Sequence, residues 1–519
     1  MTGAANHLFD ALFGAGDPER PFAFMPGDAW EAADRWYTFG HTLDVSARFA
    51  RTLRDWGVEP GDRVAVQVEK SIEAVMLYLA TVRAGGVFLP LNPAYTADEV
   101  AYFLGNAEPR VFLCDPAHEN DLRPIAAKAG TRLETLGVLR DPNDPPGTLF
   151  EADPGPGATF DDVERGPDDL AAILYTSGTT GRSKGAMLSH GNLAHNARTL
   201  AREWRFTGDD VLLHALPIFH THGLFVATNV AAAAGASMVF LPGFSVDALL
   251  AHMQRATSLM GVPTFYTRLL ADPRFTREAA SAMRLFVSGS APLLTDTHRR
   301  FEERTGHRVL ERYGMTETNM NTSNPYDGER RAGTVGPPLP GTDLRIVGEG
   351  GQPVAPGETG AIEVRGPNVF SGYWRMPERT REELTADGWF RTGDLGQESP
   401  DGYVTIVGRS KDLVISGGLN IYPKEIETRL DAVEGVEESA AFGVPHPDLG
   451  EALVAVVVGE ADPDAALEAV RSGLARFKQP RRVWRVDALP RNAMGKVLKN
   501  VLRERYADAF AESERNSLS

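Results

Sequence analysis

The sequence predicts an α/β protein with a large N-terminal body of mostly parallel sheets flanked by helices and a smaller α+β C-terminal domain. Its 519 residues are too many for one hydrophobic core, so two or more domains are expected. Helical patterns alternate with short apolar runs from residue 40 to about 315, which is typical of crossover connections between parallel strands. After Gly333, short runs separated by Gly and Pro turns favour a small β-barrel-like subdomain.

The alternation in the first half predicts individual elements in order. Apolar residues at helical spacing predict helices over residues 43–56 and 73–83, and Ser189 is a plausible cap for a third helix. Strands are expected at residues 62–68, 87–91, 170–175, 211–216, 259–262, 285–287 and 309–310. A Pro, Gly and Asp-rich span, residues 141–169, is expected to be a long surface connection.

The second half of the chain has a different pattern of predicted strands and helices. Strands are predicted at residues 343–347, 361–365, 403–407, 439–444, 452–458 and 483–486. Helices are predicted at residues 423–430, 464–475 and 499–510. We therefore expect a body over residues 1–408, with its β-rich subdomain at about 333–408, and a C-terminal α+β domain over residues 411–519.

Composition narrows the class of protein. A hydrophobic content of 42% and a charged content of 24% are ordinary for a soluble globular enzyme. The net charge of −17 argues against a nucleic-acid partner. The single cysteine, Cys114, excludes an intramolecular disulfide framework and a Cys-based zinc site. Cys114 ends an apolar run, which favours a buried thiol, and a reducing, cytoplasmic compartment fits.

No targeting or membrane-spanning segment is expected. The N-terminus lacks the basic lead of a signal peptide. Residues 224–244 are nearly uncharged and about long enough to span a bilayer, but Asn229, an Ala-Gly break and Pro242 interrupt them. A buried helix followed by a strand at 237–241 explains this segment better.

The stretch most suggestive of chemistry covers residues 176–184. Its glycines allow the backbone to curl close to a ligand, its hydroxyls donate to oxygens, and Arg182 and Lys184 supply positive charge. Phosphate is the expected ligand; the alternative is a polar surface loop. The spacing is not that of a P-loop, and the chain contains no G-x-G-x-x-G dinucleotide motif. The candidate phosphate-binding residues are Thr176, Ser177, Gly178, Thr179, Thr180, Gly181, Ser183 and Lys184.

Residues 175–184 resemble the phosphate loop of the acyl-adenylate-forming superfamily, which comprises acyl-CoA synthetases, luciferases and peptide-synthetase adenylation domains. Four further stretches match in the expected order, so the resemblance covers nearly the whole chain: residues 311–317, 390–394, 415–426 and 490–496. The resemblance implies that ATP and CoA are substrates, that Mg²⁺ accompanies ATP, and that there is no prosthetic group.

The resemblance also implies roles for matching residues at 311–317, a stretch that by itself reads as a strand end running into a polar turn. Tyr313 would lie beside adenine, Thr316 would contact the α-phosphate, and Glu317 would bind Mg²⁺. Glu311 belongs to the same nucleotide-binding stretch. A carboxylate suits this task because magnesium prefers hard oxygen ligands.

Further roles follow from the other matches. Asp394, which alone reads as a turn former, would accept hydrogen bonds from the ribose hydroxyls, with Arg409 on the nucleotide side. Lys411 occupies the hinge position between body and lid, which places the hinge near residues 409–411. Gly417 and Gly418 would line the pantetheine tunnel.

Lys496 matches the catalytic lysine of the superfamily, although an exposed lysine is usually only solvated. The implied reaction has two steps. A carboxylate attacks the α-phosphate of ATP and pyrophosphate leaves; the lid then rotates, and CoA thiol attacks the acyl-adenylate to give a thioester and AMP. Charge neutralisation and positioning would do most of the catalysis.

The best indication of the acid is Arg268, which lies among apolar residues just past a strand end. If it is buried, it needs an anionic partner; the alternative is an arginine on a helix surface. The Ser290 hydroxyl could bond the same carboxylate. The nearby wall would include His220, Thr221 and Met320. His220 and His222 alone do not indicate a metal site, because no third ligand converges on them.

This set resembles malonyl-CoA synthetases, in which the corresponding Arg and Ser hold the second carboxylate, so a small dicarboxylic acid, malonate, is expected. Three alternatives stay open: a synthetase for methylmalonate, acetate or another short acid; an adenylation module that loads a carrier protein; and a non-catalytic nucleotide-binding relative. The absence of a carrier segment after Lys496 counts against the second. The sequence does not predict the oligomeric state.

Overall fold

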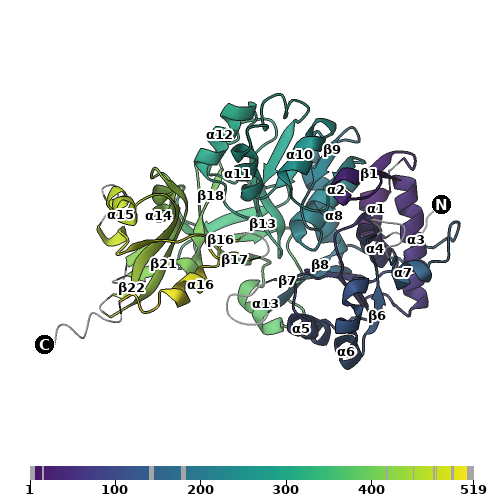
Figure 1. Cartoon of the computed structure of the whole chain (residues 1–519). Helices are drawn as coiled ribbons and strands as arrows, with labels where there is room; N and C mark the ends of the chain where they lie inside the picture. Colours follow the sequence, from purple (N-terminus) through teal and green to yellow (C-terminus); the bar gives the residue numbers. More distant parts are fainter. Residues whose placement is uncertain are drawn as a thin grey trace. The chain divides into compact units, whose positions relative to one another are not determined.

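The computed structural model describes residues 6–14, 17–138, 145–176, 183–416, 419–447, 449–471, 474, 476–492 and 496–510. Figure 1 shows the chain with its helices and strands labelled. The chain divides into two compact units. The first comprises Met1–Asp343 and Arg365–Phe390, and the second comprises Leu344–Val364 and Arg391–Ser519.

The first unit contains an eight-stranded sheet in the order β14-β13-β12-β11-β9-β10-β1-β2. Its inner strands are parallel, and both edge pairs, β13 with β14 and β1 with β2, are antiparallel. The strands are β1 (Pro21–Met25), β2 (Arg35–Thr38), β9 (Val211–His214), β10 (Ser237–Phe240), β11 (Ser258–Gly261), β12 (Leu285–Ser288), β13 (Leu310–Met315) and β14 (Asn319–Ser323). The carboxyl ends of β11, β12 and β13 therefore meet at one edge, where ligands commonly bind in such sheets.

A six-stranded sheet, in the order β6-β5-β3-β4-β7-β8, completes the first unit. All neighbours are parallel except β7 and β8. The strands are β3 (Arg63–Gln67), β4 (Val87–Pro90), β5 (Val111–Cys114), β6 (Arg132–Thr135), β7 (Leu170–Thr176) and β8 (Lys184–Ser189). The predicted body of mostly parallel sheets is confirmed, but β8 is a strand that the sequence analysis missed.

Helices cover these sheets, and several begin where the sequence predicts. Ser189 caps α8 in a reciprocal capping box with Asn192, and Ser71 caps α4. The helices of the first unit are α1 (His7–Phe13), α2 (Gly27–Trp30), α3 (Phe39–Asp55), α4 (Ile72–Arg83), α5 (Ala97–Ala107), α6 (Glu119–Ala129), α7 (Thr148–Glu151), α8 (His190–Glu203), α9 (Asn229–Ala233), α10 (Val246–His252), α11 (Pro263–Ala271), α12 (Thr295–Thr305) and α13 (Pro377–Glu383). A π-helical stretch, η2 (His222–Thr228), precedes α9.

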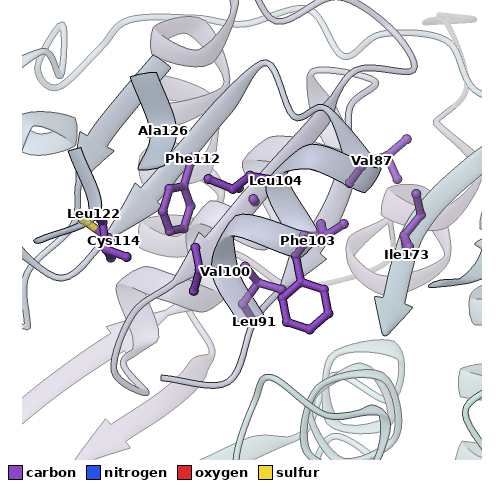
Figure 2. Close-up of a cluster of buried hydrophobic side chains, with 13 residues drawn as sticks. Val87, Leu91, Val100, Phe103, Leu104, Phe112, Cys114, Leu122, Ala126 and Ile173 are labelled. Carbon is purple, nitrogen blue, oxygen red and sulfur yellow. The ribbon is translucent and has the colours of Figure 1, made fainter. Parts of the chain in front are cut away.

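A core cluster joins the six-stranded sheet to α5 and α6. Figure 2 shows its side chains, among them Phe103 from α5, Phe112 from β5 and Ile173 from β7, all buried. Cys114 belongs to the same cluster and is fully buried, as predicted. Burial raises the pKa of its thiol to about 12, so the thiol stays protonated and behaves as a small apolar group.

The second unit contains two sheets. A four-stranded sheet has the order β15-β16-β17-β18, and the other has the order β20-β19-β22-β21, with β23 paired to β22. The elements are β15 (Asp343–Val347), β16 (Gly360–Arg365), β17 (Phe390–Glu398), β18 (Val404–Arg409), β19 (Val414–Ser416), β20 (Leu419–Ile421), α14 (Pro423–Leu430), β21 (Val436–His446), β22 (Gly450–Gly459), α15 (Pro463–Arg471), β23 (Val483–Arg485) and α16 (Lys499–Arg505).

One feature of this unit differs from expectation. The described residues of β15 to β18 form a sheet with two edges, where the sequence predicts a small β-barrel. The domain boundaries predicted from the sequence, a body over residues 1–408 and a C-terminal domain over residues 411–519, stay predictions, and so does a lid that turns near residues 409–411.

The apolar segment at residues 224–244 forms η2, α9 and β10. This confirms the expectation of a buried helix followed by a strand. Among the residues that the structure describes, no helix is long and apolar enough to cross a membrane.

Candidate active site

The predicted phosphate loop lies in sequence between β7 and β8, which pair in antiparallel register. Thr176 ends β7, Lys184 begins β8, and the Thr176 hydroxyl donates to the Lys184 carbonyl at 3.5 Å. The Ser183 carbonyl accepts a hydrogen bond from the Tyr102 hydroxyl at 2.8 Å. The remaining predicted loop residues lie outside the described part of the chain: Ser177, Gly178, Thr179, Thr180 and Gly181. The two ends of the loop are therefore fixed by the sheet.

Lys184 is linked to Glu317, the predicted magnesium ligand, through two residues that the sequence analysis missed. The Lys184 ammonium lies 3.1 Å from the Glu383 carboxylate and 4.2 Å from the centre of the Tyr373 ring. The Tyr373 hydroxyl lies 3.0 Å from Glu317 Oε1 and also bonds Glu383. Burial, and then the neighbouring Glu317, raises the pKa of Tyr373, so its hydroxyl stays protonated and can donate its one proton to either carboxylate.

The other predicted residues of this stretch lie on β13 and the turn that follows it. Tyr313 and Thr316 are half-buried, while Glu317 is buried. The carboxylate of Glu311 lies 3.3 Å from His298 Nδ1 and accepts a hydrogen bond from the Gly333 amide at 3.2 Å. Burial raises the pKa of Glu311. Its carboxylate therefore has partners within the protein, and its nucleotide-binding role stays a prediction.

Three of the predicted acid-binding residues, His220, Thr221 and Ser290, lie around His222 near the carboxyl end of β12. The Ser290 hydroxyl lies 3.2 Å from His222 Nδ1, and the amide of His222 donates to His220 Nδ1 at 3.3 Å. Thr221 and Met320 are buried. Burial lowers the pKa of His220 to about 4 and that of His222 well below its ordinary value, so both rings are neutral at pH 7. This wall is polar and uncharged.

Arg268 does not join that wall as a buried charge. It is exposed on α11, which turns Phe265 and Leu269 inward, and its guanidinium lies 5.6 Å from the centre of the Phe244 ring. Phe244 and Phe265 line a cavity of about 430 Å³. Because Arg268 is not buried, the argument that it needs an anionic partner fails, and its role in substrate binding stays a prediction.

In the second unit, the predicted ribose-binding Asp394 pairs with Arg409 at 2.6 Å across the β17–β18 hairpin. Lys411 lies in the single turn η4 (Ser410–Asp412) and is exposed. Gly417 and Gly418 lie outside the described residues. The structure thus brings Asp394 and Arg409 together and does not address the pantetheine tunnel.

Lys496, the predicted catalytic lysine, is exposed as a residue, but neighbouring atoms partly desolvate its ammonium group. This desolvation lowers the pKa of Lys496 to about 8, with a further contribution from the cation of Arg409. The carboxylate of Asp394 acts in the opposite direction. The lysine is therefore charged at pH 7 but loses its proton over a mildly alkaline range.

The rate of adenylation is therefore expected to fall as pH rises through about 8, because only the protonated Lys496 can stabilise charge on the α-phosphate. Pyrophosphate release between pH 6.5 and 9.5 measures this step, and Lys496→Arg, whose guanidinium stays charged, should move the fall to higher pH. An unchanged profile in Lys496→Arg would assign the alkaline limb to another group.

The fold and this arrangement of groups define an enzyme that activates an acid with a nucleotide. A model of the AMP-binding enzyme family matches residues 14–374, and its C-terminal domain model matches residues 425–496. The chain belongs to the AMP-binding enzyme family. It is an AMP-forming acid–thiol ligase that uses ATP, CoA and a carboxylic acid.

Three relatives illustrate the range of acids within the family. The crystal structure of ATP-bound MatB from Rhodopseudomonas palustris superposes with a TM-score of 0.93 at 56% identity, covering 97% of this chain and 99% of that one. A malonate–CoA ligase from Arabidopsis thaliana is 33% identical over 96% of this chain and 90% of its own length. A feruloyl-CoA synthase from an Amycolatopsis species is 38% identical over 89% and 92%.

Proposed function

We propose that the enzyme joins malonate to CoA through a malonyl-adenylate, releasing pyrophosphate and then AMP. Sequence identity alone does not select this acid, because a feruloyl-CoA synthase and a malonate–CoA ligase are similarly related to the chain. The observation that supports malonate is the polar wall at the end of β12, where the Ser290 hydroxyl meets His222.

The distal carboxylate of malonate needs polar groups like these if it is buried in the site. Transferring an ionised carboxylate from water into an apolar pocket is strongly unfavourable unless hydrogen-bond donors or cations replace the lost hydration. Ser290 offers a hydroxyl, and its left-handed backbone, at φ 70°, is an uncommon conformation for a residue with a side chain. The acyl chain of a fatty or aromatic acid gains nothing from these groups.

In the first step, adenylation, different residues of the chain would have different roles. Lys184 and the loop that it ends would hold the phosphates, and Asp394 would hold the ribose. Lys496 would neutralise charge on the α-phosphate as the carboxylate attacks. The carboxylate of Glu317 is a hard-oxygen donor that fits Mg²⁺, which when bound would neutralise phosphate charge. Tyr373 and Glu383 would keep Glu317 and Lys184 in place.

A panel of acids tests this proposal. Malonate is expected to give at least about tenfold higher kcat/KM than acetate, propionate or ferulate, a difference of about 1.4 kcal/mol. Thioester formation and pyrophosphate release are measured with and without CoA. Methylmalonate as the best acid would support the alternative short-acid synthetase. Adenylation without thioester formation from CoA would support an adenylation module that loads a carrier protein. The absence of pyrophosphate release with every acid would support a non-catalytic relative.

A further inference from the structure

A largely buried ion pair joins two helices of the second unit. Lys499 is the first residue of α16, and its ammonium lies 2.6 Å from the carboxylate of Glu427 on α14. The two side chains are only 17% and 10% exposed. Glu427 also accepts a hydrogen bond from the Ala441 amide of β21 at 3.0 Å. Burial alone would raise the pKa of Glu427, but neighbouring lysine cations and the Ala441 amide lower it on balance, so the carboxylate is charged at pH 7.

The two helices lie on opposite faces of the sheet that β21 ends. Ala441 belongs to the same core cluster as Ile426 of α14, whereas its neighbour Phe442 belongs to the cluster of Leu502 on α16. Such a division follows from the alternation of side chains along a strand. The ion pair therefore passes around the edge of the sheet. Apolar packing is non-directional, so this directed contact is what fixes the rotation of α16 on its face.

Stability alone is a poor explanation for this ion pair. Taking two charges out of water costs about as much as their attraction returns, and apolar side chains of similar volume often stabilise a protein as well or better. A role in orientation explains the pair more directly. The residue that it would orient lies three positions before Lys499 and is Lys496, the predicted catalytic lysine.

The backbone ties Lys496 to the start of α16. The Lys496 amide donates to Asn492 Oδ1 at 3.0 Å, and the Asn492 amide donates to the Lys496 carbonyl at 2.9 Å. The Leu498 amide donates to the Pro490 carbonyl at 2.8 Å, and α16 begins at the next residue. A change in the rotation of the first turn of α16 would therefore move Lys496.

A second ion pair extends from the same face of α16. Arg503 lies four residues after Lys499, and residues at this spacing share a helix face. Its guanidinium lies 3.2 Å from the Asp412 carboxylate in η4 and donates to the Lys411 carbonyl at 3.4 Å. The charges of Lys411 and Asp412 both act on the Lys496 ammonium. This pair thus ties α16 to the surroundings of the predicted catalytic lysine.

We propose that Lys499 and Glu427 are positioning residues for adenylation: their ion pair fixes the first turn of α16 and thereby the place of the Lys496 ammonium. Arg503 and Asp412 provide a second, weaker tie, because their side chains are more exposed and exposed pairs contribute little. The inference rests on the proposed function, since it takes Lys496 as the residue that neutralises charge on the α-phosphate.

The test removes the pair without leaving either charge unpaired. In the double variant Glu427→Gln/Lys499→Met, the glutamine can still accept from the Ala441 amide, so the midpoint of thermal unfolding should stay close to that of the wild type. Pyrophosphate release from ATP and malonate is expected to slow by about tenfold or more, because a misplacement of 1 Å can cost about 100-fold. Thioester formation from supplied malonyl-adenylate should be much less affected.

The pH profile provides a readout that a purely structural role would not change. In the wild type, desolvation lowers the pKa of Lys496 to about 8. A displaced ammonium regains water, so the alkaline fall of adenylation in the double variant should move to higher pH. Arg503→Met should change the rate and the profile in the same direction by less. Arg505→Met is the matched control, because it removes an exposed cation of the same helix and should change neither.

Three results would overturn the inference. They are an alkaline limb that stays in place in the double variant, an unchanged rate of adenylation, and an equal loss of both half-reactions with a large fall in the unfolding midpoint. Lys496→Ala, measured alongside, separates these results from a failure of the proposed function. Wild-type adenylation by Lys496→Ala would refute the proposed role of the lysine itself. Slow adenylation by Lys496→Ala with a normal double variant would refute only the positioning.

Discussion

Lys496→Ala is expected to slow adenylation by about 10²-fold or more, the scale of losing one preorganised charge donor at a transition state. Desolvation, with a further contribution from the Arg409 cation, lowers the pKa of its ammonium to about 8. Pyrophosphate release from ATP and malonate measures the step. Thioester formation from supplied malonyl-adenylate should be much less affected, because the second half-reaction starts after the α-phosphate has been attacked.

Lys128→Ala provides the matched control, since Lys128 is exposed at the end of α6 and its loss should leave both half-reactions unchanged. Equal loss of both half-reactions in Lys496→Ala would contradict the separation of roles. It would indicate that Lys496 maintains the fold of the second unit or contacts the acyl-adenylate in both steps.

Lys411→Pro is expected to leave adenylation in place while CoA transfer falls by an order of magnitude or more, because a proline ring fixes φ at the predicted hinge. The residue lies in the single turn η4, closed by the Leu413 amide bonding the Ser410 carbonyl at 3.3 Å. A φ near −65° is compatible with such a turn, so one arrangement should be retained. Single-turnover measurements of the two half-reactions separate the steps.

Lys411→Ala removes the same side chain but leaves φ free, so it should support both half-reactions. Loss of CoA transfer in Lys411→Ala as well would assign the effect to the lysine's charge. Full turnover at the normal rate by Lys411→Pro would show that the second step needs no rotation at this residue.

Local sequence signals predicted most of the elements. Ser189 was identified as a cap because hydroxyl residues before an apolar periodic run satisfy free amides, and the structure shows that bond. Cys114 was predicted to be buried from the apolar run that it ends. The strand β8 is not predicted from the sequence because it directly follows the polar loop, and Lys184, Gly185 and Ser189 leave only three consecutive apolar residues in it.

The sequence predicts some residues of the candidate site and misses others. The resemblance assigns roles to Tyr313 and Glu317 but none to Arg312, which lies between Glu311 and Tyr313 and is buried. Strand alternation alone indicates that Arg312 faces the opposite side from its neighbours. The exposure of Arg268 follows from the apolar face of α11, which includes Phe265 and Leu269.

Long-range contacts account for what the sequence did not show. Tyr373 and Glu383 reach Glu317 and Lys184 from distant parts of the chain, and no local spacing relates them. The grouping of Leu344–Val364 with the C-terminal unit likewise depends on strand pairing across the chain rather than on composition.

A direct competition between malonate and propionate tests the proposed recognition of a second carboxylate. The wild-type enzyme receives malonate and propionate at equal, limiting concentrations with ATP and CoA, and mass spectrometry measures the ratio of the two thioesters, which reports the ratio of kcat/KM values. The account predicts at least about tenfold more malonyl-CoA than propionyl-CoA. Equal amounts, or an excess of propionyl-CoA, would contradict the claim that this site recognises a second carboxylate.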